Sequence, residues 1–149
     1  MMRIALGYPE PDVEAEILAT HGVASTLPDI GPVTDAPGVA EMIHQARQVH
    51  VAPTVRRYIV DIVEATRSHP DVYLGASPRA SIMLLRASRA MAACEERDYV
   101  IPDDVKALAP AVLSHRIIVT ADSVMSGRAA HAVLTELLAE VPVPIQRKA

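Results

Sequence analysis

The chain has 149 residues, 50% of them hydrophobic and 21% charged, which is the size and composition of one globular domain rather than of a disordered segment. Its net charge of -4 provides no basic face for nucleic acid, so nucleic-acid binding is not expected. Phe and Trp are absent and only four Tyr occur, which leaves aliphatic side chains to build the core and favours closely packed helices.

The cysteine content and the hydropathy pattern indicate the compartment. Cys94 is the single cysteine and cannot form an internal disulfide. Its position beside Ala92 and Ala93 predicts a small hydrophobic side chain packed within a helix. The sequence has no run of about 18 apolar residues and no charged start followed by an apolar signal region, so no membrane span or signal peptide is predicted. We therefore expect a cytoplasmic protein.

The first 36 residues predict little packed structure. Residues 3–8 form a short apolar stretch that suits a strand running into a turn, although the sequence offers this strand no partner. Asp12 is expected to cap a short helix that continues through Thr20. Residues 22–37 contain three Pro and two Gly, which predicts a linker or an irregular loop.

Apolar residues then recur at helical spacing to the end of the chain. The expected helices span residues 37–48, 53–68, 77–97, 103–115 and 130–141. Residues 82–85 are consecutive apolar residues and point around the whole circumference of the third helix, so this helix should be central. Residues 117–119 should form a short extended link. The predicted fold class is all-α, a bundle of about five helices preceded by an orphan strand-helix segment.

Motifs that carry catalysis or bind metals are scarce. The sequence lacks a Gly-rich phosphate loop with its Lys and Ser/Thr, an acidic pair after a strand, and any CxxC or HExxH spacing. The six His residues are scattered without the spacing of metal ligands. Ser77 lies in the sequence G-A-S-P-R and lacks the context of a nucleophile elbow. We expect neither a catalytic site nor a metal site in this chain alone.

One motif, Gly75–Ala80, stands out at the start of the third expected helix. Ser77 is a good N-cap, Pro78 suits the first helical position, and Gly75 permits a tight approach of the backbone. Arg79 then lies in the first turn, where a cation is unfavourable by a few tenths of a kcal/mol. This position invites an anionic partner. Contact of Arg79 with solvent or with a nearby carboxylate is the alternative.

The run from Tyr73 to Ala80 resembles the sensor 2 motif of the MoxR branch of AAA ATPases. The resemblance covers nearly the whole chain, with further matches in the same order at residues 3–9, 49–53, 58–60, 65–67, 98–105 and 113–117. Ile101 departs from the hydroxyl residue that commonly precedes the Pro-acidic pair of the family. The resemblance implies that residues 1–36 are the connection from an ATPase core and that residues 37–149 are the helical lid.

The resemblance also implies a function. In an intact ATPase the lid would close over ATP, with Arg79 at the terminal phosphates, Gly75 and Ser77 at the helix start beside it, and Tyr8 on the adenine side. ATP and magnesium would be the cofactors, and no magnesium ligand is expected in this chain. The activity would be chaperone-like remodelling of another protein.

The implied partners are the AAA core domain, the neighbouring subunits of a ring, and a metal-dependent adhesion protein of the von Willebrand factor A type. The core's phosphate loop, magnesium carboxylate, sensor 1 and arginine finger do not occur in the sequence, so the chain alone is predicted to be inactive. The alternative is a freestanding helical interaction module with no nucleotide role.

Overall fold

The computed structural model describes residues 2–22 and 31–144. Residues 23–30 of the linker expected at residues 22–37 therefore lie outside the described residues. The helices are α1 (Pro11–His21), α2 (Ala36–Gln48), α3 (Pro53–Ser68), α4 (Pro78–Cys94), α5 (Pro102–Leu113), α6 (Ala121–Met125) and α7 (Ala130–Glu140), and a 3-10 turn at Ser114–Arg116 follows α5. Strands β1 (Val72–Leu74) and β2 (Ile118–Val119) pair antiparallel. The fold is mainly helical, as predicted.

Proline residues mark most of the helix starts. Pro11, Pro53, Pro78 and Pro102 each occupy the first position of a helix. Proline is favourable there because its missing N–H would have no partner within the helix. The five helices predicted from periodicity begin and end within three residues of α2, α3, α4, α5 and α7.

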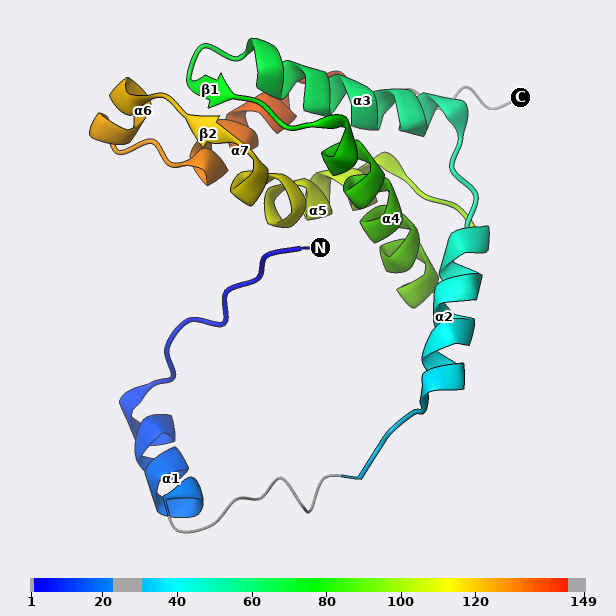
Figure 1. Ribbon diagram of the computed structural model, residues 1–149, viewed down its shortest axis with the longest axis vertical. Coiled ribbons are helices and arrows are strands. Elements are labelled where there is room, and N and C mark those ends of the chain that lie inside the picture. Colours follow the sequence, from blue (N-terminus) through cyan, green and yellow to red (C-terminus); the bar gives the residue numbers. More distant parts are fainter. Residues whose placement is uncertain (1, 23–30, 145–149) are drawn as a thin grey trace.

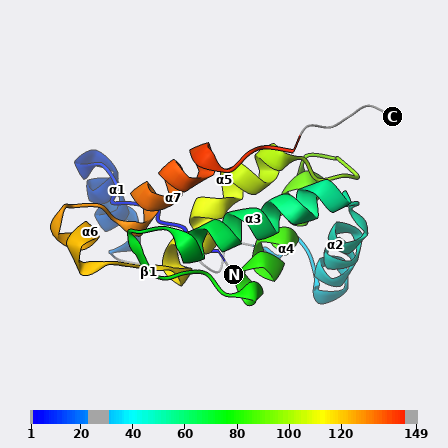
Figure 2. The ribbon, with the colours of Figure 1, turned by 90° about the horizontal axis from the view of Figure 1, so that it is seen from above.

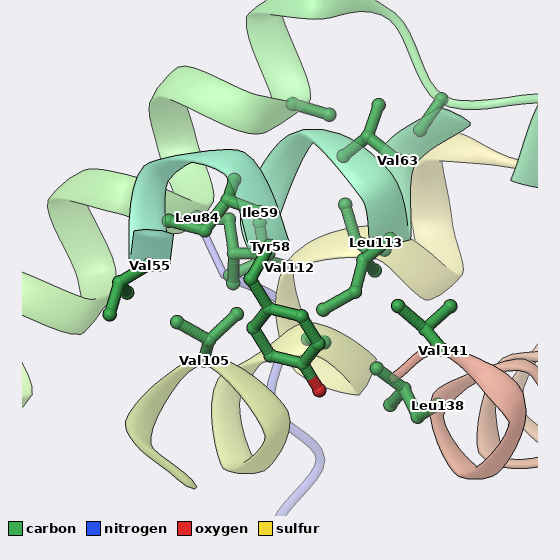
Figure 3. Packing of buried hydrophobic residues seen from close by; sticks show 14 of the residues in the cluster. Val55, Tyr58, Ile59, Val63, Leu84, Val105, Val112, Leu113, Leu138 and Val141 are labelled. Atoms are coloured by element: carbon green, nitrogen blue, oxygen red, sulfur yellow. The ribbon is translucent and has the colours of Figure 1, made fainter. Parts of the chain in front are cut away.

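The core lies between α3, α4, α5 and α7. Figure 2 shows α3, α5 and α7 side by side, and α4 contacts α2, α3 and α5. In Figure 3 the ring of Tyr58 lies among aliphatic side chains, with its hydroxyl near Leu138 and Val141. That hydroxyl has no hydrogen-bond partner among the described residues. Burial, together with the negative charge of Asp103, raises the pKa of Tyr58.

The expectation that α4 would be apolar and buried on every side is only partly correct. Its contacts with three helices give it the predicted central position. Leu84 is fully buried, but Ile82 is 48% exposed, because one face of α4 has no neighbouring helix in the described structure. Cys94 was expected to be packed and is instead exposed, because it is the last residue of the helix.

The prediction for the N-terminal segment was also partly wrong. Residues 2–10 form no strand, because the described sheet pairs only β1 with β2, and Arg3 N–H instead donates to the carbonyl of Ala111 at 2.8 Å. Helix α1 starts after Glu10, so Asp12 lies inside the helix and is not its cap. No residue of α1 is buried, and Figure 1 shows this helix apart from the bundle.

A partly buried ion pair connects the loop after α4 to the first turn of α5. Asp104 is 4% exposed and accepts hydrogen bonds from both terminal nitrogens of Arg97 at 2.6 and 2.9 Å. It also accepts the backbone N–H of Ile101 at 2.9 Å, which satisfies a donor at the start of α5. Hydrogen bonds to Asp104 and Glu95 raise the pKa of Arg97. The start of α5 is thus held by Asp104 although Ile101 has no side-chain acceptor.

Among the described helices, none is both long enough and apolar enough to cross a membrane.

Candidate functional site

The loop between β1 and α4 is held against the end of α3 by hydrogen bonds to both the N–H and the carbonyl of Ala76. The N–H of Ala76 donates to the hydroxyl oxygen of Thr66 at 2.9 Å, and the carbonyl of Ala76 accepts from Nε of Arg67 at 2.9 Å. The hydroxyl of Thr66 in turn donates to the carbonyl of Val63 at 2.6 Å. These bonds leave the loop little freedom where it enters α4. We call this set of contacts the Ala76 clamp.

Gly75 lies where the loop before α4 comes closest to the end of α3. A Cβ atom at position 75 would lie 2.7 Å from the Cα and Cγ atoms of Arg67 and 2.8 Å from the carbonyl oxygen of Thr66. Two of these atoms are backbone atoms, so a side chain could be accommodated only if the loop moved away from α3. The backbone at Gly75 therefore approaches α3 closely, as expected from the sequence.

The β-sheet holds the other side of the loop. In β1, Val72 and Leu74 are opposite Val119 and Ile118 of β2. Beyond the pair, the N–H of Thr120 donates to the carbonyl of Asp71 at 2.9 Å. The loop therefore runs from a paired strand directly into the Ala76 clamp.

The helix start differs in one detail from the expectation. Ser77 is the N-cap of α4, but its side chain makes no capping hydrogen bond. Its carbonyl accepts the N–H of Ala80 at 2.8 Å. The hydrogen bonds of Ala76, and not the side chain of Ser77, restrain the backbone where it enters α4.

Arg79 is the second residue of α4 and is exposed. No hydrogen bond or ion pair joins its side chain to any part of the chain that the structure describes. The nearby carboxylate that could have neutralised it is therefore not found among the described residues. The Ala76 clamp fixes the backbone three residues before this cation and leaves its side chain open to solvent.

Tyr8 does not join this site. Its side chain is fully exposed on the extended segment before α1, so it does not pack against Gly75, Ser77 or Arg79. The described residues contain no group of three or more His, Cys, Asp or Glu side chains that could hold a metal ion.

The sequence analysis matched residues 65–67 to the family but did not predict that Thr66 and Arg67 would hold the loop before α4. Thr66 continues the buried stripe of α3 after Ile62 and Val63 at the helical spacing of three and four residues. A polar residue on an otherwise apolar stripe needs a specific hydrogen-bond partner, and this was the signal available in the sequence. The partner itself, ten residues away, could not be read from the stripe.

Replacing Thr66 with valine should lower the free energy of unfolding by about 1–3 kcal/mol, because the buried N–H of Ala76 loses its acceptor. Thr66→Ser keeps the hydroxyl and should lower the free energy of unfolding by less than Thr66→Val does. Urea unfolding of the chain would measure both changes. Thr135→Val is the matched control, since the hydroxyl of Thr135 is exposed and bonds only within its own helix. Equal stability of Thr66→Val and the unchanged chain would contradict the role of the clamp.

Comparison with known proteins identifies the fold that carries this site. The family described as "AAA lid domain" matches residues 64–137, which include the end of α3, the clamped loop, α4, α5 and most of α7. A crystal structure of a candidate ATPase from Cytophaga hutchinsonii superposes with a TM-score of 0.86 at 28% identity, over 97% of this chain and 47% of that one.

Two sequence relatives indicate to which group of proteins with an AAA lid domain the chain belongs. YeaC of Bacillus subtilis is 36% identical over 149 residues, which cover all of this chain and 47% of that protein. Chaperone MoxR1 of Mycobacterium tuberculosis is 33% identical over 97% of this chain and 40% of that protein. The chain belongs to the MoxR family of AAA ATPases and carries the lid domain. It spans less than half the length of these relatives.

Proposed function

We propose that the chain serves as the sensor 2 lid of a MoxR-type ATPase, in which Arg79 contacts the terminal phosphates of ATP. The observation that supports this role is an exposed arginine without a counter-charge among the described residues, placed in the first turn of a helix whose start is clamped. The proposal assigns residues 1–36 to the connection with an ATPase core and residues 37–149 to the lid.

The electrostatics of the helix start fit a phosphate group. Arg79 lies near the positive end of α4, where a cation alone is unfavourable and an anion is favourable. A bound phosphate would therefore interact favourably with both the guanidinium and the helix end. Gly75 and Ser77 would bring the backbone close to the nucleotide. Tyr8 would reach the adenine side only after a core domain had ordered the segment that carries it.

The same residues do not fit magnesium, because the described part of the chain offers no cluster of metal ligands. In this proposal the lid contributes the positive charge of Arg79, and the magnesium that accompanies ATP is held by the core. Bound ATP supplies the phosphoryl group that is transferred to water. Arg79 stabilises the negative charge that develops on the phosphate oxygens during that transfer.

The Ala76 clamp also gives the lid a way to pass on the nucleotide state. Arg79 is connected through Ala76 to Thr66 and Arg67 of α3, so a force at the phosphates acts on the helical bundle and not on a loose loop. Movement of the bundle would reach the neighbouring subunits of a ring. The name of the relative Chaperone MoxR1 supports remodelling of a partner protein, for which an adhesion protein of the von Willebrand factor A type is our candidate. We place this activity in the cytoplasm.

The isolated chain should show no magnesium-dependent ATP hydrolysis above a blank, because one arginine cannot replace a phosphate loop and a bound metal ion. Fused to a MoxR-type core from which the native lid has been removed, the same chain should restore turnover. A coupled assay of ADP release would measure both. Hydrolysis by the isolated chain, or failure of the fusion to exceed the core alone, would contradict the lid role.

A further inference from the structure

A second cluster of arginine residues lies away from Arg79, between α2 and α4. The two helices border a cavity of about 530 Å³ that is lined by Ile43, Ala46, Arg47, Arg86, Arg89 and Ala90. We call it the arginine groove. Arg89 lies ten residues after Arg79 on the same helix, which is about 15 Å along the helix axis. The groove and the candidate nucleotide site could therefore be occupied at the same time.

The charges of this groove are not neutralised within the described structure. The three arginine side chains form no ion pair with any described residue, and no carboxylate is among the groove's lining residues. Nε of Arg89 is buried without a hydrogen-bond partner in the described part of the chain. A buried donor without an acceptor is unfavourable, and like charges at close range repel. Both costs fall when a carboxylate or phosphate enters the groove.

The apolar surface beside the arginines favours a polypeptide over a small anion. Val39, Met42 and Ile43 recur at helical spacing on α2 and are 44%, 57% and 48% exposed. This stripe has the spacing typical of a buried helix face, but no residue of α2 is buried. Phosphate would neutralise the arginines and leave the apolar stripe in water. An amphipathic helix with acidic and apolar residues would cover both.

We infer that the arginine groove is a docking site for an acidic amphipathic helix of a partner protein. Carboxylates of that helix would pair with Arg47, Arg86 and Arg89, whose planar guanidinium groups can bind a carboxylate through two hydrogen bonds. Its apolar side chains would pack on the stripe formed by Val39, Met42 and Ile43. This inference concerns a different surface from the nucleotide site and does not depend on the proposed function.

The test uses the chain labelled with ¹⁵N and a 16-residue helical peptide of Glu, Leu and Ala, with Leu spaced at three and four residues. The peptide should shift the amide signals of α2 and of the second half of α4, together with the Nε–H signals of the three groove arginines. Replacing every Glu of the peptide with Gln should weaken binding at least tenfold, and raising the salt from 50 to 500 mM should also weaken it, since salt screens exposed charges.

Variants of the chain show how much the arginine charges and the apolar contacts each contribute to peptide binding. The double variant Arg86→Gln and Arg89→Gln should weaken peptide binding at least tenfold. Met42→Ser should weaken binding several-fold, and its exposure makes loss of the fold unexpected. Arg56→Gln is the matched control, because Arg56 is an exposed arginine of α3 outside the groove, and it should leave affinity unchanged.

Three results would overturn the inference. If inorganic phosphate or ATP shifts the groove signals while the peptide does not, the groove is a small-anion site. If the chain associates with itself and loses that association in the Arg86→Gln and Arg89→Gln variant, a second copy occupies the groove. If millimolar peptide shifts no groove signal, the groove is not a docking site for an acidic helix. None of these results depends on ATP hydrolysis, so each can be told apart from failure of the lid proposal.

Discussion

Replacing Arg79 with alanine should lower ATP turnover about 100-fold or more in an ATPase assembled from this lid and a MoxR-type core. The expected loss corresponds to about 3 kcal/mol of transition-state stabilisation, as for removal of one well-placed donor to a developing negative charge. Single-turnover measurement with saturating ATP would separate the chemical step from nucleotide binding. Arg79→Lys should retain part of the rate, because it keeps the charge but loses the planar guanidinium.

The same substitution should barely change the stability of the isolated chain. Arg79 is exposed and makes no ion pair with the described residues, so Arg79→Ala should alter the free energy of unfolding by no more than about 0.5 kcal/mol. Arg56→Ala, which removes another exposed arginine, is the control for both measurements and should leave turnover unchanged. An unchanged ATPase rate in Arg79→Ala, or a large loss of stability, would mean that Arg79 has a structural role.

Gly75→Ala should destabilise the chain by about 1–3 kcal/mol, which is the usual range for forcing extra atoms into a packed site. The new methyl group would lie 2.7 Å from the Cα of Arg67 and 2.8 Å from the carbonyl oxygen of Thr66. Because both contacts involve backbone atoms, the loop would have to move and the hydrogen bonds of Ala76 would lengthen or break. Chemical or thermal unfolding would measure the loss.

Gly31→Ala is the matched control, since a Cβ atom at position 31 would meet no atom within 4 Å. Its effect should stay within about 0.5 kcal/mol. In the assembled ATPase, Gly75→Ala should also reduce turnover, because the backbone that carries Arg79 would be displaced. A Gly75→Ala variant as stable as the unchanged chain would show that the loop adapts without strain and that the Ala76 clamp is not rigid.

Local sequence information determined most of the helical structure. Apolar residues at intervals of three and four predicted the helix of Pro53–Ser68, and Pro78 at the first helical position predicted the start of α4. The Gly75–Ala80 run placed Arg79 in the first turn of α4 for the same local reason. These features depend on residues within one or two helical turns of each other, so the sequence alone could determine them.

Tertiary contacts decided the features that local patterns predicted wrongly or missed. The apolar stripe of α2 has the spacing of a buried helix face, yet it stays exposed because no described element packs over it. Residues 3–8 have the composition of a strand, but a strand also needs a partner to accept its hydrogen bonds, and the described sheet provides none. The Ala76 clamp joins residues ten positions apart across a turn, and only the packing of β1 and α4 against α3 brings them within hydrogen-bonding distance.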